Sequence, residues 1–371
     1  MFHKLFQILI PALTYSFCLQ FCALQITLAE PIKIGVPIPL TGDNATLGED
    51  IKNAIILANE LFPSTKYQFI FEDDRCDNTT ARSIAEKLIN YDKVKYALGF
   101  GCNSSLIASA PLYEKANILV LSSSGTSGDI PSLGKNNFRI FPADQIGAEL
   151  LASYSAKKGY QQIAVVTESN QYSVMMERSF LSVLKKSAPQ VKIFSEEFIH
   201  PATDLHALAT RVLTKKPDIV FLNPNTDTAF ISLFKRFYTL NPKQKYIAVY
   251  LPASATILAE FKERLDGVVF ANLPSNTELA TPNGELLLNK FNAKFGQPKA
   301  GFPVVLTTLE AVRILDLAID SNQDPINYLT NLKVSDGLMS SYYFDKNGAI
   351  QGLNFELQEV RNAKVIKHSG F

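Results

Sequence analysis

Short apolar runs alternate with helical patterns along almost the whole of this chain, and no other feature limits its fold as strongly. Runs such as Ile32–Ile38, 96–98 and 118–121 are rich in Ile, Val, Leu and Ala, which is typical of strands buried on both faces of a sheet. A longer segment with helical periodicity follows each run. Repeated strand–helix units form parallel sheets with right-handed crossovers. We therefore predict an α/β protein in which parallel sheets are flanked by helices.

The alternation divides into two successive sets, the first ending near Pro142 and the second near Pro274. After Pro274 the pattern changes to helices, and a hairpin-like end is expected from 340–344 and 353–360 around a turn at 345–348. A chain of 371 residues is long enough for two domains.

The first 29 residues read as a secretory signal peptide. A basic start at Lys4 precedes an uncharged apolar stretch, and the stretch ends in small residues that predict cleavage after Ala29. An uncleaved anchor is disfavoured because Pro11 and two glutamines interrupt the stretch. Lipid attachment at Cys22 is a minor alternative, since Phe21 stands where a small residue would be needed. No later segment is long and apolar enough to span a bilayer.

Two cysteines, Cys76 and Cys102, remain after the signal is removed. An even number of cysteines in an oxidising compartment favours a disulfide. Each cysteine follows a predicted strand, so adjacent parallel strands would bring the two within bridging distance. A metal or catalytic thiol is the alternative, but neither cysteine has a histidine nearby in the sequence.

Two polar loops, 99–105 and 121–128, follow the predicted strands 96–98 and 118–121. Ligands of parallel α/β sheets bind outside the carboxyl ends of the strands. Serine and threonine hydroxyls, together with the free N–H groups at a helix N-terminus, suit a small anion such as a carboxylate. The alternative is that these residues simply favour turns.

Charge and motif content exclude several function classes. The net charge of +1 is spread along the chain, which gives no footprint for nucleic acid or for a membrane surface. Phosphate-binding, dinucleotide-binding and hydrolase loop motifs are absent, and the four histidines have no metal-ligand spacing. We expect no enzyme activity, no catalytic residue, no metal and no cofactor.

Several motifs together resemble one known family. They are 32–35 with Thr41, Gly42 and Gly48; Glu72-Asp73-Asp74-x-Cys76-Asp77; Gly99-x-x-Cys102-x-Ser104-Ser105; 118–121 with Thr126; Gln171-Tyr172; and Phe344-Asp345-x-x-Gly348. The chain resembles the type I periplasmic binding proteins of the leucine/isoleucine/valine-binding group, the soluble components of ABC importers. The Asp-Asp-x-Cys and Gly-x-x-Cys pair is its most specific part, because leucine-binding members carry their disulfide at these cysteines.

The resemblance implies two lobes joined by three crossings, near Pro142, Pro274 and Ile350, that close around ligand by a hinge motion. We expect residues 1–29 to be the signal peptide, 30–142 plus 275–349 the N-terminal lobe, and 143–274 plus 350–371 the C-terminal lobe. It also implies a periplasmic monomer that captures an amino acid or a related carboxylate or amide and delivers it to ABC permease subunits. The alternative is a sensor protein that presents its closed form to a signalling receptor.

Carried over by position, the resemblance predicts a set of ligand-binding residues. Asn103, Ser104 and Thr126 would hold a carboxylate, the Ser124 carbonyl would accept from an ammonium, and Tyr172 would cover the ligand. Three further positions depart from the family pattern: Leu47 and Asn225 replace aromatic residues, and Tyr250 replaces the acid that pairs the ammonium.

A buried ammonium without a carboxylate is costly. We considered Asp227 and Glu168 as substitutes from neighbouring loops. A neutral amide, a keto acid or an aromatic carboxylate therefore remains open as ligand.

Overall fold

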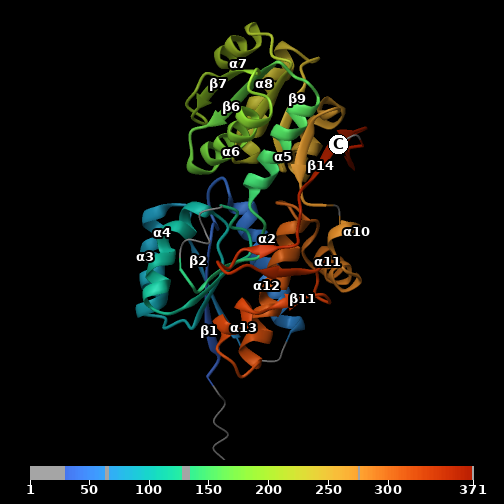
Figure 1. Cartoon of the computed structure of the whole chain (residues 1–371). Coiled ribbons are helices and arrows are strands. Elements are labelled where there is room, and N and C mark those ends of the chain that lie inside the picture. The colour runs from blue at the N-terminus through green and yellow to red at the C-terminus, as the bar shows by residue number, and fades with distance from the viewer. Residues whose placement is uncertain (1–29, 63–66, 128–133, 275, 370–371) are drawn as a thin grey trace, which may run out of the picture. The chain divides into compact units, whose positions relative to one another are not determined.

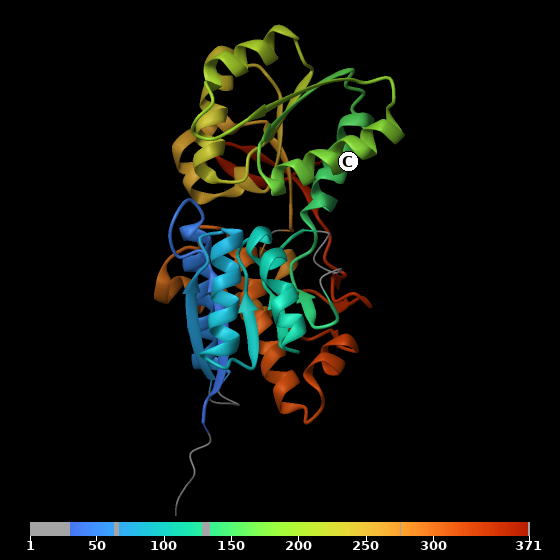
Figure 2. The same ribbon diagram turned by 90° about the vertical axis from the view of Figure 1, so that its left-hand side faces the viewer.

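A computed structural model describes residues 30–62, 67–127, 134–274 and 276–369, which form three sheets and the helices around them (Figures 1 and 2). The predicted signal peptide, its cleavage site and Cys22 lie outside these residues. Among the described residues, no helix has the length and apolar character needed to cross a membrane.

The first sheet has five strands in the order β2-β1-β3-β4-β5, and every neighbouring pair is parallel. We call this sheet and its helices the first lobe. Its strands are β1 (Ile32–Ile38), β2 (Tyr67–Asp73), β3 (Tyr96–Gly99), β4 (Leu119–Ser122) and β5 (Asn137–Arg139). The helices that follow the first three strands are α2 (Ala45–Leu61), α3 (Asn78–Asn90) and α4 (Asn103–Lys115).

The second sheet has seven strands in the order β15-β14-β10-β9-β8-β6-β7, and we call it and its helices the second lobe. Its parallel strands are β6 (Gln162–Glu168), β7 (Lys192–Phe198), β8 (Ile219–Asn223), β9 (Tyr246–Val249) and β10 (Val269–Asn272). The helices are α5 (Asp144–Lys157), α6 (Gln171–Ser187), α7 (Leu205–Thr214), α8 (Asp227–Leu240) and α9 (Ala255–Phe261), with two 3₁₀ turns, η2 (Leu251–Ala253) and η3 (Lys262–Leu265).

Four helices follow β10 along the chain: α10 (Asn276–Leu279), α11 (Pro282–Phe295), α12 (Phe302–Asp320) and α13 (Pro325–Thr330). Helix α12 packs against α2, so the chain returns to the first lobe after completing β10. The structure confirms the predicted fold class of parallel sheets flanked by helices. Sheet membership changes between β5 and β6, after β10, and again before β14; the residue boundaries of the lobes stay a prediction.

A hairpin forms around the expected turn at 345–348, but the expected segment 353–360 is not its second arm. Strand β12 (Tyr342–Phe344) pairs with β11 (Lys333–Val334) and with β13 (Ile350–Gln351) in a small sheet of its own. Strand β14 (Glu356–Arg361) instead joins the second lobe, where it runs antiparallel to β10 and to β15 (Lys364–Lys367). The sequence pattern predicted the strands but not their partners, because the residues of β10 that pair with β14 are 84 to 90 residues away from it in the sequence.

Helix starts follow capping chemistry. Asp77 caps α3 as expected, since its side chain accepts from the N–H of Thr80. Helix α4 begins at Asn103, two residues before the predicted start at Ser105. The first turn of α4 therefore contains Asn103 and Ser104, two of the predicted ligand residues.

Candidate functional site

Asn103 and Thr126 lie together at the carboxyl ends of two adjacent strands. Strands β3 and β4 are parallel, and Gly99 is opposite Ser122. The Oδ1 atom of Asn103 accepts from the backbone N–H groups of Thr126 (2.7 Å) and Ser127 (2.9 Å), and Nδ2 donates to Oγ1 of Thr126 at 3.3 Å. The structure thus brings the two residues into direct contact.

Two of the predicted serines have different surroundings. The Ser104 hydroxyl donates to the carbonyl oxygen of Cys76 at 2.9 Å, so it fixes the loop after β2. Ser124 is buried in the segment after β4. A hydrogen bond from the Gly125 N–H to the Ser122 hydroxyl, at 2.9 Å, spans it in the sequence.

Helix α12 also shapes the segment after β4. The Thr307 hydroxyl donates to the Ser123 carbonyl at 2.9 Å, and the Thr308 hydroxyl donates to the Ser123 hydroxyl at 2.9 Å. All three residues are fully buried or nearly so. The backbone that leads into Ser124 and Thr126 is therefore held from both sides.

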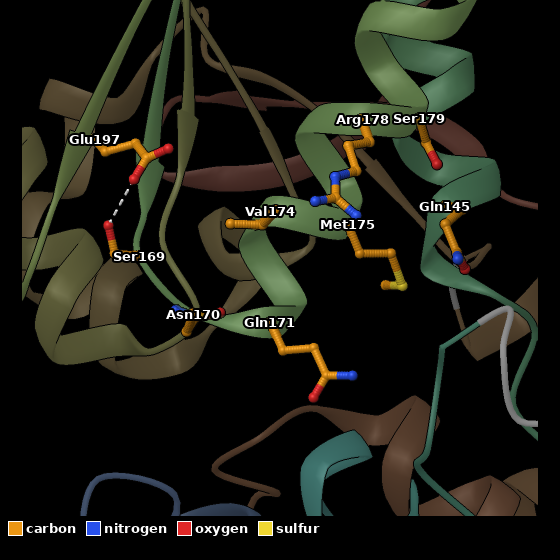
Figure 3. A pocket seen from close by; sticks show the side chains of 9 residues that line it. All are labelled: Gln145, Ser169, Asn170, Gln171, Val174, Met175, Arg178, Ser179 and Glu197. Atoms are coloured by element: carbon orange, nitrogen blue, oxygen red, sulfur yellow. Dashed lines mark hydrogen bonds between the residues drawn. The ribbon is translucent and has the colours of Figure 1, made fainter.

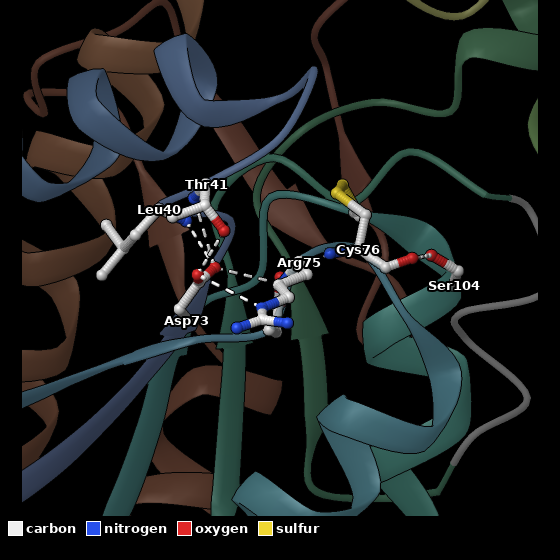
Figure 4. Close-up of a disulfide and its surroundings, with 8 residues drawn as sticks. Leu40, Thr41, Asp73, Arg75, Cys76 and Ser104 are labelled. Carbon is white, nitrogen blue, oxygen red and sulfur yellow. Dashed lines mark hydrogen bonds and ion pairs between the residues drawn. A yellow bond between two sulfur atoms is a disulfide. The ribbon is translucent and has the colours of Figure 1, made fainter.

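The disulfide joins Cys76, in the loop after β2, to Cys102, the N-cap residue of α4 (Figure 4). The neighbouring Asp73 accepts from the backbone N–H groups of Leu40 (2.8 Å) and Thr41 (3.3 Å) and from the Thr41 hydroxyl (2.6 Å). The disulfide and these hydrogen bonds together connect the loops after β1, β2 and β3 into one framework. The predicted bridge between Cys76 and Cys102 is confirmed.

Leu47 lies beside the loop that precedes Asn103. A methyl group added at Gly101 would be 3.4 Å from Cδ2 of Leu47 and 2.8 Å from Cδ of Pro39. Glycine at position 101 therefore allows the first turn of α2 to approach the start of α4. We call Leu47, Asn103, Ser104, Ser124 and Thr126 the first-lobe group.

In the second lobe, Tyr172 is the second residue of α6 and Tyr250 follows β9. Their hydroxyl groups are close enough for each to influence the pKa of the other. The Tyr172 hydroxyl also donates to Oδ2 of Asp144 at 2.9 Å. We call Tyr172, Asn225 and Tyr250 the second-lobe group.

Asp144, which sequence analysis missed, links the two groups. It is the first residue of α5, and its N–H donates to the carbonyl of Thr126 at 3.3 Å. Burial raises the pKa of its carboxyl to about 6, and the Tyr172 and Thr126 side chains and the charge of Arg139 only partly offset this. The sequence does contain a signal for this residue, because two charged residues, Arg139 and Asp144, flank the predicted crossing at Pro142.

The two acids considered as ammonium partners, Glu168 and Asp227, have different hydrogen-bond partners. The Asn225 N–H donates to Oε2 of Glu168 at 2.8 Å, so Glu168 joins β6 to the loop after β8. Asp227 accepts from the Ser254 hydroxyl at 2.5 Å, and burial raises the pKa of its carboxyl. Asp227 is close enough to Tyr250 to influence its pKa electrostatically.

A cavity of about 620 Å³ opens in the second lobe around the start of α6 (Figure 3). None of the eight predicted ligand residues lines it. Its wall includes Gln145, Gln171, Met175 and Arg178, and at one side of it the Ser169 hydroxyl donates to Glu197 at 3.0 Å. Met175 receives a hydrogen bond from the Ser127 hydroxyl at 3.4 Å, so the cavity adjoins the residue next to Thr126.

Comparison with known proteins agrees with this arrangement. The family model described as "Periplasmic binding protein" matches residues 31–345. The chain belongs to this family. Because the family consists of solute-binding proteins, its members are not enzymes and act outside the cytoplasm, and the prediction of no enzyme activity is confirmed.

Similar proteins cover nearly the full length of this periplasmic binding protein. The Leu/Ile/Val-binding protein of Escherichia coli K12 is 24% identical over 348 residues, which cover 91% of this chain and 93% of that protein. A leucine binding protein from Thermotoga maritima has a TM-score of 0.81 at 18% identity, covering 91% and 98% of the two chains.

A third similar structure holds a different kind of ligand. It is the solute binding protein of an ABC transporter from Rhodopseudomonas palustris BisB5 in complex with 3,4-dihydroxybenzoic acid, with a TM-score of 0.77, 21% identity and coverage of 89% and 93%. These comparisons support a transport role, and they give the sensor alternative no support.

Proposed function

We propose that this periplasmic binding protein captures a small carboxylate-bearing solute, such as an amino acid or a related acid, and delivers it to ABC permease subunits. The first-lobe group would anchor the carboxylate and the second-lobe group would cover the rest of the ligand. We propose further that the protein is a monomer exported by a cleaved signal peptide.

The observation that carries this proposal is the pairing of Asn103 with Thr126. The Asn103 side chain orders the Thr126 and Ser127 backbone, and the first turn of α4 adds N–H groups that the helix itself leaves free. Hydroxyl and backbone donors at a helix N-terminus bind a carboxylate without a buried counter-ion. The relatives support this choice of group, because leucine and 3,4-dihydroxybenzoic acid share a carboxylate.

A thermal-shift screen of protein stripped of ligand by unfolding and refolding tests the proposal. The panel contains leucine, isoleucine, valine, other amino acids, benzoate, hydroxybenzoates and small amides. A ligand at 100 times its Kd adds about 2.7 kcal/mol to the free energy of unfolding. A response only to solutes without a carboxylate would overturn the proposal.

Substitution of Thr126 by Val then tests the anchor. We expect the binding free energy of the best ligand to weaken by about 1–3 kcal/mol, because the carboxylate loses a donor. Thr239→Val, at an exposed position near the end of α8, is the matched control and should leave the affinity unchanged. Calorimetric titration of both variants gives the comparison, and equal affinities would remove Thr126 from the site.

A further inference from the structure

Met175 is the methionine of the described residues that has access to solvent. The sequence contains four methionines; Met1 lies in the predicted signal peptide, and Met176 and Met339 are completely buried. Met175 is only partly buried, and its side chain lines the cavity at the start of α6 (Figure 3). Met175 and Met176 are neighbours on one helix, so they differ in environment although they share the same local backbone.

The sulfur atom of Met175 connects two parts of the fold. It accepts a hydrogen bond from the Ser127 hydroxyl, with an Oγ–Sδ distance of 3.4 Å. Ser127 follows β4 of the first lobe, whereas Met175 belongs to α6 of the second lobe. Because a thioether is a weak acceptor, this bond is a weak link between the lobes while the sulfur is reduced.

Ser127 itself is firmly held. Its N–H donates to Oδ1 of Asn103 at 2.9 Å, and its carbonyl oxygen accepts from Nη1 of Arg139 at 2.5 Å. Both partners belong to the first lobe, Asn103 on α4 and Arg139 on β5. The Ser127 hydroxyl is therefore presented to Met175 from a fixed backbone, and the strength of the contact depends on the chemical state of the sulfur.

We propose that Met175 is a site of reversible oxidation, and that its sulfoxide tightens the contact between α6 and the segment after β4. A two-electron oxidant of the peroxide class supplies the oxygen. The sulfur attacks one oxygen of hydrogen peroxide, so an S–O bond forms as the O–O bond breaks. The departing hydroxide takes the proton from the transferred oxygen and leaves as water. The sulfur loses two electrons and the peroxide gains them.

The surroundings of Met175 suit this product. The cavity has room for the added oxygen, and polar side chains such as Gln171 and Arg178 already form part of its wall. A sulfoxide oxygen is a stronger hydrogen-bond acceptor than a thioether sulfur, and the flexible methionine side chain lets it turn towards the Ser127 hydroxyl. Oxidation of Met176 would instead place a polar group in the hydrophobic core.

Oxidation reaches solute binding through Ser127, and in this respect the inference rests on the proposed function. Thr126, the residue next to Ser127, belongs to the proposed carboxylate anchor, and separation of the lobes is expected to accompany solute release. A stronger bond between the lobes should slow this separation. The oxidised protein would hold its solute longer, and a methionine sulfoxide reductase would restore the original rate.

Peptide mapping by mass spectrometry tests the modification site. The folded protein is treated with hydrogen peroxide, the reaction is stopped with catalase at intervals, and the digested protein is mapped. We expect Met175 to be oxidised at least about tenfold faster than Met176 or Met339, because oxidation follows exposure. Methionine sulfoxide reductases A and B together should reverse the change. Comparable rates at the three methionines, or an unmodified Met175, would overturn the proposal.

Hydrogen–deuterium exchange tests the contact without any ligand. In the oxidised wild-type protein, amide exchange over residues 122–127 should slow by about threefold, because local opening becomes less favourable. Ser127→Ala lacks the hydroxyl and should show no slowing on oxidation. Met175→Leu has no sulfur at this position and is the matched control for peroxide treatment. Unchanged exchange in the oxidised wild-type protein, or equal slowing in Ser127→Ala, contradicts the contact with Ser127.

The dissociation rate of the best carboxylate from the thermal-shift screen tests the consequence. Stopped-flow measurement should give a rate about threefold lower for oxidised wild-type protein, and an unchanged rate for peroxide-treated Met175→Leu. An equal or faster rate in the oxidised wild-type protein overturns the effect on solute release. A protein that binds no carboxylate overturns the proposed function, and peptide mapping and hydrogen exchange still decide the modification and the contact.

Discussion

The first-lobe and second-lobe groups differ in how their polar atoms are satisfied. In the first lobe, Asn103 uses its amide on three atoms of its neighbours, and the disulfide and Asp73 brace the loops behind it. In the second lobe, Tyr172 donates to Asp144, whose other carboxylate oxygen is buried and has no partner within the described part of the chain. Among the described residues, the Asn103 amide has partners on both its oxygen and its nitrogen, whereas one oxygen of the Asp144 carboxylate has none.

This difference indicates that the first-lobe group and the second-lobe group contribute differently to ligand binding. A prebuilt framework binds with little loss of conformational freedom, so it suits the carboxylate that different ligands share. The second-lobe cluster keeps an unpartnered buried oxygen among the described residues, so its polar atoms are less completely bonded. The predictions below test whether the first lobe owes its rigidity to covalent and buried polar contacts, and whether the second lobe is the more adjustable side.

The largest expected effect comes from removing the disulfide with the double substitution Cys76→Ser and Cys102→Ser. The bridge spans 26 residues, and its loss should lower the free energy of unfolding by about 3 kcal/mol because the unfolded chain gains freedom. Urea unfolding measures the change, and dithiothreitol-treated wild-type protein is the control. An unchanged midpoint would show that hydrogen bonds alone hold the first-lobe framework.

A smaller effect is expected from Asp74→Asn. Burial raises the pKa of the Asp74 carboxyl to about 6, so the folded protein holds this proton after the unfolded chain has released it. The contribution of Asp74 to stability is present at low pH and is lost as pH rises from about 4 to about 6. Asparagine carries no charge, and it can still accept from the Cys76 N–H as Asp74 does at 2.9 Å.

The variant should therefore be more stable than the wild-type protein at pH 7 by about 1–3 kcal/mol, and the advantage should vanish near pH 4. Urea unfolding at several pH values gives this comparison. A variant less stable than wild type at pH 7 would mean that the ionised Asp74 is needed by the framework around Cys76.

The smallest effect is expected from Ser254→Ala in the second lobe. The variant removes the hydroxyl that donates to Asp227, which should lower the free energy of unfolding by about 1 kcal/mol. Because this bond lowers the pKa of Asp227 and burial raises it, the titration midpoint of Asp227 should move upward. Carboxyl NMR titration reads the midpoint, and a downward shift would contradict the assignment of Ser254 as the donor.

Topology explains why the first-lobe group was predictable from sequence. Adjacent parallel strands bring the loops that follow them to one edge, so Asn103 and Thr126 had to meet once β3 and β4 were recognised. The disulfide was also expected, on the premise that the strands before the two cysteines are adjacent; the bridge is confirmed, but β1 lies between β2 and β3, so it joins loops that are one strand apart. Ser104 was expected to bind ligand, but nothing in its sequence neighbourhood indicated its bond to the Cys76 carbonyl.

The hydrogen bond between Tyr172 and Asp144 was not predictable in the same way. The two residues are 28 positions apart on different helices and meet through side-chain packing. The strand–helix pattern places both helices in the second lobe but gives no side-chain directions. The pairing of β14 with β10 was missed for a similar reason, since the sequence of a short strand does not specify which distant strand it pairs with.

The contact of Ser123 with Thr307 and Thr308 has a consequence for folding during synthesis. Synthesis proceeds from the N-terminus, so Ser123 leaves the ribosome 184 residues before Thr307. Until α12 has emerged, nothing can donate to the Ser123 carbonyl from that side, and contacts between residues so far apart form late in folding. The segment that carries Thr126 therefore gains its contacts with α12 only after most of the chain has been synthesised. A nascent chain that lacks α12 does not yet have this part of the candidate site in its final form.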